Sequence, residues 1–184
     1  MSTESDAVRS ELLLLRHRAG DRGALAELVA LWERPLLYYL RRLLDTEQDA
    51  WDALQESWLH ALRELPRLRD DRAFPAWLYT IARRVALRAR RRARPVEPLP
   101  EDDEPGAPAV AEPEAPLAGV DPLDVHRALA TLSLPHRDVL TLHFLEGFSV
   151  AEIAAITGAP AGTVKSRLFH ARRALKKLLE GGSS

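Results

Sequence analysis

The side chains best suited to chemistry lie near the C-terminal end of the 184-residue chain. Cations and hydrogen-bond donors gather there around an apolar helical stripe, and such groups suit DNA phosphates and base edges. The stripe that would be buried consists of Val164, Leu168, Ala171 and Leu175. The candidate DNA-binding side chains outside it are Thr163, Lys165, Ser166, Arg167, His170 and Arg173.

The residues before this helix complete a helix-turn-helix pattern. Ser149 with Glu152 forms a capping box at the start of one helix. Gly158 stands where a tight turn needs a residue that tolerates positive φ, and Pro160 suits the first turn of the next helix. The pattern over residues 149–175 therefore predicts a second helix that enters a major groove.

A second concentration of positive charge lies between positions 83 and 94, where seven arginines occur without an acid. The alternative is the solvated basic end of a helix, but this density favours duplex phosphates and a salt-dependent affinity. The arginines that we predict to bind DNA are Arg83, Arg84, Arg88 and Arg91.

Enzymatic chemistry is not indicated. The six histidines show no metal-ligand spacing, cysteine is absent, and we find no Gly-rich phosphate loop or nucleophile elbow. We expect no catalytic residue, metal or cofactor. The chain also lacks a signal-peptide layout and an apolar run long enough to cross a bilayer. A cytoplasmic protein without membrane insertion is expected.

The elements that position these residues fall into two blocks. The net charge of −1 hides a segment, 95–122, with eight prolines, several acids and no Lys or Arg. Such a composition predicts an extended linker. Both flanking blocks show helical periodicity and no alternating strand pattern. We therefore predict an all-α protein: two small helical domains, 1–94 and 121–184, joined by a flexible acidic Pro-rich linker over 95–120.

Four helices are expected in the N-terminal domain. The first three begin near residues 6, 23 and 46, and the fourth follows a loop over 67–72. Pro35 is expected to kink the second helix. Thr46 with Asp49 resembles a capping box at the start of the third helix, and Pro66 ends it. The buried stripe predicted for that helix is Trp51, Leu54, Trp58, Leu62 and Leu65.

Two stretches resemble one family. The run over 134–178, which contains GTVKSRL, resembles region 4 of extracytoplasmic-function sigma factors, group 4 of the sigma-70 family. The run over 52–92 resembles region 2 of the same family, with Gln55-Glu56 and the string FPAWLY from Phe74 to Tyr79 as its markers. Response-regulator activators share a similar helix-turn-helix, so region 2 is what makes the resemblance specific.

The resemblance implies partners and roles. The chain would bind core RNA polymerase (β and β′ subunits) and promoter DNA, recognise −10 and −35 elements, and help to melt the promoter. It implies that Asp49, Asp52, Gln55 and Glu56 contact the polymerase, although a solvated helix face would look the same. The helix-turn-helix residues would read the −35 element. The −10 element would meet Arg67, Arg69, Phe74, Trp77, Tyr79, Arg83, Arg84, Arg88 and Arg91. For Trp77 a core aromatic is an equal alternative.

Some points stay open at this stage. Arg84, Arg88 and His170 depart from the residues common in the family, which leaves the preferred promoter sequence undetermined. A regulator that binds DNA without polymerase, or an adaptor that binds polymerase without DNA, is an alternative function. An anti-sigma factor is a possible third partner, because the sequence contains no fused sensory domain.

Overall fold

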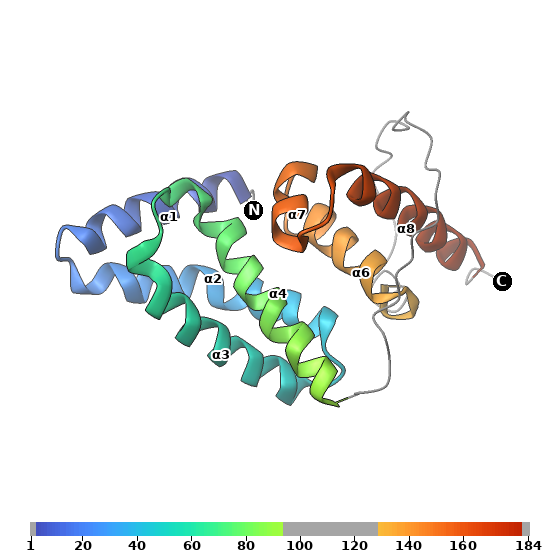
Figure 1. Cartoon of the computed structure of the whole chain (residues 1–184), viewed down its shortest axis with the longest axis horizontal. Helices are drawn as coiled ribbons and strands as arrows, with labels where there is room; N and C mark the ends of the chain where they lie inside the picture. The colour runs from blue at the N-terminus through green and yellow to red at the C-terminus, as the bar shows by residue number, and fades with distance from the viewer. Residues whose placement is uncertain (1–2, 94–128, 182–184) are drawn as a thin grey trace.

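The structure, a computed structural model, describes residues 3–93 and 129–181 (Figure 1). Seven α-helices, three short helical turns and a further helical stretch at 129–131 occur in these ranges. No strand occurs in these two ranges, so the all-α prediction is confirmed. The predicted linker over 95–120 lies outside the described residues.

The first four helices form one bundle. They are α1 (Thr3–Arg18), α2 (Arg22–Leu43), α3 (Glu47–Glu64) and α4 (Phe74–Ala93), with the 3-10 turns η1 (Leu65–Arg67) and η2 (Asp71–Ala73) before α4. α2 continues through Pro35. The fully buried side chains of the bundle include Leu14, Leu36, Tyr39 and Leu78. Burial of such side chains stabilises the bundle by about 1.5–3 kcal/mol each.

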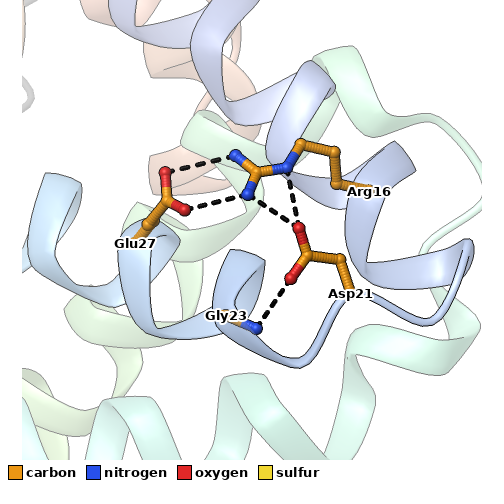
Figure 2. Close-up of polar contacts among 4 residues, drawn as sticks. All are labelled: Arg16, Asp21, Gly23 and Glu27. Carbon is orange, nitrogen blue, oxygen red and sulfur yellow. Dashed lines mark hydrogen bonds and ion pairs between the residues drawn. The ribbon is translucent and has the colours of Figure 1, made fainter.

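The α1–α2 hairpin shows how local chemistry sets this packing. The chain turns at Gly20, whose φ is 96°, and the Asp21 carboxylate caps α2 by accepting from the Gly23 N–H at 2.8 Å. Arg16 of α1 donates to Asp21 and also to Glu27 of α2, at 2.7 and 3.0 Å (Figure 2). This guanidinium therefore ties both helices to the turn between them.

The predicted buried stripe of α3 is partly wrong. Trp51 and Leu62 are 38% and 39% exposed, whereas Leu54, Trp58 and Leu65 are buried as expected. The inward face is centred instead on small residues: Ala50, Ala53, Ser57 and Ala61. Small side chains let α3 approach α2 and α4 closely, which turns the two large residues toward solvent.

The C-terminal elements are α6 (Leu134–Leu140), the π-helical turn η3 (Thr141–Leu145), α7 (Val150–Thr157) and α8 (Ala161–Gly181). The predicted capping box of Ser149 and Glu152 is present at the start of α7. Gly158 ends α7 in the left-handed conformation, with φ 71°. The predicted capping box and turn glycine of the helix-turn-helix are therefore confirmed, whereas Pro160 directly precedes α8 and does not lie in its first turn.

The two groups of helices pack against each other. α7 lies against α4, and α6 and η3 contact α2 (Figure 1). Phe148, the residue before the capping box, packs its ring 4.9 Å from that of Tyr79 in α4. One continuous apolar core therefore links the N-terminal bundle to the C-terminal helices.

Candidate nucleic-acid interface

The helix α8 carries the predicted −35 surface, defined as the six candidate residues from Thr163 to Arg173. Its apolar stripe, Val164 to Leu175, is buried against α6 and α7, as the spacing predicted. Lys165 and Arg173 are exposed. Thr163, Ser166, Arg167 and His170 are half-buried. All six therefore lie on one helix, around a face that does not contribute to the core.

Phe169 organises part of this surface. The Arg173 guanidinium lies 5.6 Å from the centre of the Phe169 ring, and the His170 ring meets it edge-on at 5.3 Å. The sequence shows Phe169 only as an apolar residue on a polar face. The structure gives it contacts with two predicted DNA-binding side chains.

The predicted −10 surface consists of nine residues in the loop before α4 and along α4. Arg67 and Arg69 are exposed in the loop. The loop is held by Arg18 of α1, whose Nη2 donates to the Leu68 carbonyl at 2.9 Å and to Asp71 at 2.6 Å. Sequence reasoning missed Arg18, because its partners lie 50 and 53 residues further along the chain.

The aromatic members of the −10 surface are less accessible than their predicted role requires. Phe74 is 1% exposed and Tyr79 is fully buried, packed between the rings of Trp32, Tyr39 and Phe148. Trp77 is half-buried, with its ring 5.8 Å from that of Phe74. Only Trp77 of these three presents part of its ring to solvent in this arrangement.

Arg83 is likewise withdrawn from solvent. Its Nε donates to Asp138 of α6 at 2.6 Å, and its Nη1 donates to the Thr157 carbonyl at the end of α7 at 3.3 Å. Asp138 also accepts from the Tyr39 hydroxyl at 2.9 Å. Burial lowers the pKa of Arg83, but the charge and hydrogen bond of Asp138 outweigh burial, and the pKa stands above its ordinary value. Arg83 is therefore a charged group held inside an interface.

A second polar pair crosses the same interface. The Tyr79 hydroxyl donates to Glu146, just after η3, at 2.5 Å. Burial raises the pKa of Glu146 to about 7, against the opposing effects of this hydrogen bond and of the Arg42 charge. Burial also raises the pKa of Tyr79 well above its ordinary value. We call the contacts of Arg83, Asp138, Tyr39, Tyr79 and Glu146 the interdomain contact.

The remaining arginines of α4 face outward. Arg84 and Arg91 are exposed, and Arg88 lies 3.5 Å from Glu56 of α3. Arg90, by contrast, is tied to Asp45 at 2.9 Å and to the Leu43 carbonyl at 3.0 Å. The outer face of α4 therefore keeps most of its positive charge toward solvent.

Three of the four predicted polymerase-binding residues lie together. Asp49, Asp52 and Glu56 of α3 line an open groove with Ala89 and Arg92 of α4. Gln55 is exposed on α3 but does not line that groove. The acids thus form a negative edge beside the arginines of α4.

Two further properties concern the described residues alone. In ranges 3–93 and 129–181, no group of three or more His, Cys, Asp or Glu side chains is placed to hold a metal ion. Within the same ranges, no helix is both long and apolar enough to cross a membrane.

The fold and these surfaces define a transcription protein with a helix-turn-helix, and comparison with known proteins identifies its family. The sigma-70 region 2 family matches residues 28–96, and the sigma-70 region 4 family matches residues 123–175. The chain belongs to the sigma-70 family, among the extracytoplasmic-function sigma factors, and is a promoter-specific transcription initiation factor.

Relatives match it over almost their whole length. It is 36% identical to the extracytoplasmic-function sigma factor SigL of Mycobacterium tuberculosis, covering 98% of this chain and 97% of the relative. It is 34% identical to the RNA polymerase sigma-H factor of Pseudomonas aeruginosa, covering 94% of each.

Two solved structures share the fold. The sigma factor RpoE of Bartonella quintana, solved with the anti-sigma factor NepR, matches with a TM-score of 0.64 and 28% identity, over 85% of this chain and 96% of that one. CnrH, solved with the cytosolic domain of CnrY, matches with a TM-score of 0.68 and 25% identity, over 95% and 99%.

Proposed function

We propose that this sigma factor binds core RNA polymerase, reads a −35 element with α8, and reads and helps to melt a −10 element with the loop before α4 and with α4 itself. The observation that carries the proposal is the pair of basic surfaces, one in each matched region and in the family's order. Region 2 would span residues 1–94, the linker 95–120 and region 4 residues 121–184. The role is one of binding, without catalysis or a cofactor, in the cytoplasm.

The two surfaces have different chemical tasks in this proposal. Lys165, Arg167 and Arg173 on α8 can donate to phosphates and to guanine edges in the major groove. The exposed Arg67 and Arg69 suit the backbone of a melted strand, whose unstacked base needs a pocket nearby. Arg84, Arg88 and Arg91 suit duplex phosphates beside it.

The acidic edge of α3 is the proposed polymerase contact. Asp49, Asp52 and Glu56 can pair with basic side chains of the β′ subunit, and charge complementarity of this kind speeds association. Exposed Gln55, Trp51 and Leu62 lie on the adjoining side of the same helix and extend the contact with amide and apolar surface.

Simultaneous use of both surfaces requires the two domains to separate. Two elements about 25 base pairs apart lie roughly 85 Å apart along B-DNA. Residues 94–128, 35 in number, can reach about 115–125 Å if fully extended, so the chain is long enough. The packed arrangement of α4 against α7 is therefore the state before promoter binding.

The test is reconstituted transcription. A promoter would first be found by sequencing the genomic fragments that bind to the complex of this chain with core polymerase. Purified chain added to core polymerase should then give a run-off transcript of fixed length from that promoter. Core polymerase alone is the negative control. Tight, sequence-specific duplex binding by the free chain without stimulation of polymerase would favour the DNA-only regulator. Stimulation that survives charge reversal of Lys165 and Arg167 would favour the adaptor.

We further propose that a separate anti-sigma protein controls the chain, since RpoE above is a sigma factor solved with an anti-sigma factor and CnrH was solved with the cytosolic domain of CnrY. Purification of the tagged chain from its native host, followed by mass spectrometry, tests this. A small protein recovered in place of the polymerase subunits, and able to block run-off transcription when added back, is the expected result.

A further inference from the structure

The carboxylate of Asp138 serves the interdomain contact rather than its own domain. Its side chain is 3% exposed, and among the described residues its hydrogen-bond partners are Tyr39 and Arg83, both in the N-terminal bundle. A buried carboxylate is costly unless it is paired. Asp138 therefore depends on the packed arrangement, in which those partners are supplied from 99 and 55 residues away in sequence.

The oxygens around Arg83 are of the kind that a DNA phosphate would offer. A carboxylate oxygen lies 2.6 Å from Nε, and a main-chain carbonyl at the C-terminal end of α7 lies 3.3 Å from Nη1. Guanidinium groups bind carboxylates and phosphates through the same planar array of donors. A helix C-terminus adds partial negative charge to this side of the site.

The packed arrangement leaves Arg83 no room for a phosphate. Its side chain is 19% exposed, and α7 lies against α4 beside it. The neighbouring Arg84 and the more distant Arg91 remain exposed on the same helix. Packing therefore removes one arginine from the run while the α8 surface, which has no part in the interdomain contact, stays accessible.

We propose that Asp138 is a built-in substitute for a promoter phosphate: in the packed state it occupies Arg83 and keeps this arginine of the −10 surface from binding DNA. DNA and Asp138 compete for one guanidinium, so the domains must part before Arg83 binds the promoter. The inference rests on the proposed function for the role of the −10 surface.

The competition can be tested in the full chain. Because the chain contains no cysteine, Ala30→Cys in α2 and Ala155→Cys in α7 give two exposed spin-label positions. The interdomain distance would be measured by pulsed electron resonance. Binding to a 20-base-pair mixed-sequence duplex would be measured by fluorescence anisotropy over a salt series, because phosphate contacts are independent of sequence.

Asp138→Asn should lengthen and broaden the distance distribution, because it removes the charge that pairs with Arg83. Its duplex affinity should rise about tenfold, since the separated state gains one arginine–phosphate contact that the packed state lacks. The salt dependence should steepen by about 0.9 in log–log slope for one added phosphate contact.

Two variants separate competition from simple loosening. Arg83→Ala also breaks the pair and should lengthen the distance, but without a gain in affinity or slope, because the competing group itself is lost. Asp21→Asn is the matched control. It neutralises an aspartate paired with an arginine inside one domain (Figure 2), so it should change neither measurement.

The results for these variants test the competition for Arg83 separately from the proposed sigma function. Opening by Asp138→Asn without a change in duplex affinity or slope would overturn the inference, as would an unchanged distance. If Asp138→Asn fails to fold, Tyr39→Phe removes only the hydroxyl donor to Asp138 and should shift both measurements less, in the same direction. Run-off transcription by the unmodified chain tests the sigma function itself and needs none of these variants.

Discussion

The two predicted DNA surfaces of this protein differ in how the packed state treats them. The −35 surface lies on one helix, α8, and takes no part in the interdomain contact. The −10 surface is distributed over a loop and α4, and two of its members meet the C-terminal helices. Tyr79 is buried with its ring against Phe148, and half-buried Arg83 donates to Asp138 of α6 and to the Thr157 carbonyl of α7. In the proposed competition, packing of the two domains therefore covers part of one surface only, and we expect promoter recognition to begin at α8 before region 2 is released.

The largest expected effect comes from reversing charge on the accessible surface. Lys165→Glu with Arg167→Glu should reduce run-off transcription from a −35-dependent promoter at least 100-fold. Each lost base or phosphate contact costs about 1–3 kcal/mol, and the new acids repel the backbone. The interdomain distance should not change, because neither residue lies in the interdomain contact.

Lys177→Glu is the control for that pair, since it reverses one exposed cation at the far end of the same helix. It should reduce transcription by no more than about twofold, as expected for a distant screened charge. Equal losses from both changes would mean that α8 binds DNA through its general positive charge. The six residues of the −35 surface would then not form a specific site, and the contrast with the partly covered −10 surface would not hold.

The next effect concerns pH and the covered surface. Because the pKa of Glu146 is raised to about 7 in the packed state, that state binds a proton which the separated state releases. Packing is therefore favoured below pH 7 and weakened as pH rises through 7. The ratio of packed to separated chain should fall about tenfold between pH 6 and pH 8. Among the described residues, the Tyr79 hydroxyl donates to this carboxyl and the Arg42 charge acts on it.

Pulsed electron resonance on the doubly labelled chain, frozen from solutions of different pH, measures this ratio. Glu146→Gln should remain packed at pH 8 and lose the pH dependence, because the amide resembles the protonated acid. A pH dependence that persists in Glu146→Gln would assign the titration to another group. At pH 6, where both proteins are packed, they should bind duplex DNA with the same affinity.

The difference between the α8 surface and the partly covered −10 surface also separates what the sequence could predict from what it could not. The α8 stripe, the capping box and Gly158 follow from spacing within 30 residues, and the structure confirms them. The pairing of Arg83 with Asp138 joins residues on either side of the unpatterned segment 95–120, and no local period connects them. The inward face of α3 differs from the predicted stripe because its small alanines permit close helix packing, while the large Trp51 and Leu62 lie partly in solvent.

The smallest expected effect concerns the shape of the −10 loop. Arg18 donates from one nitrogen to the Leu68 carbonyl and to Asp71, which fixes the start of the loop relative to η2. Arg18→Ala should lower the thermal midpoint only slightly, because a partly exposed pair contributes about 1 kcal/mol or less.

A positioning role for Arg18 predicts more than this loss of stability. Discrimination between the preferred −10 base and its substitutes should fall about threefold in run-off assays at saturating sigma factor, since a displaced loop holds the unstacked base less closely. Arg18→Lys should restore part of it, because an ammonium can still reach one of the two oxygens. Arg16→Ala, which loosens the α1–α2 turn instead (Figure 2), should lower stability and leave base discrimination unchanged. Equal discrimination in Arg18→Ala and the unmodified chain would show that the loop holds its shape without α1, and the −10 surface would then differ from the −35 surface only in being covered.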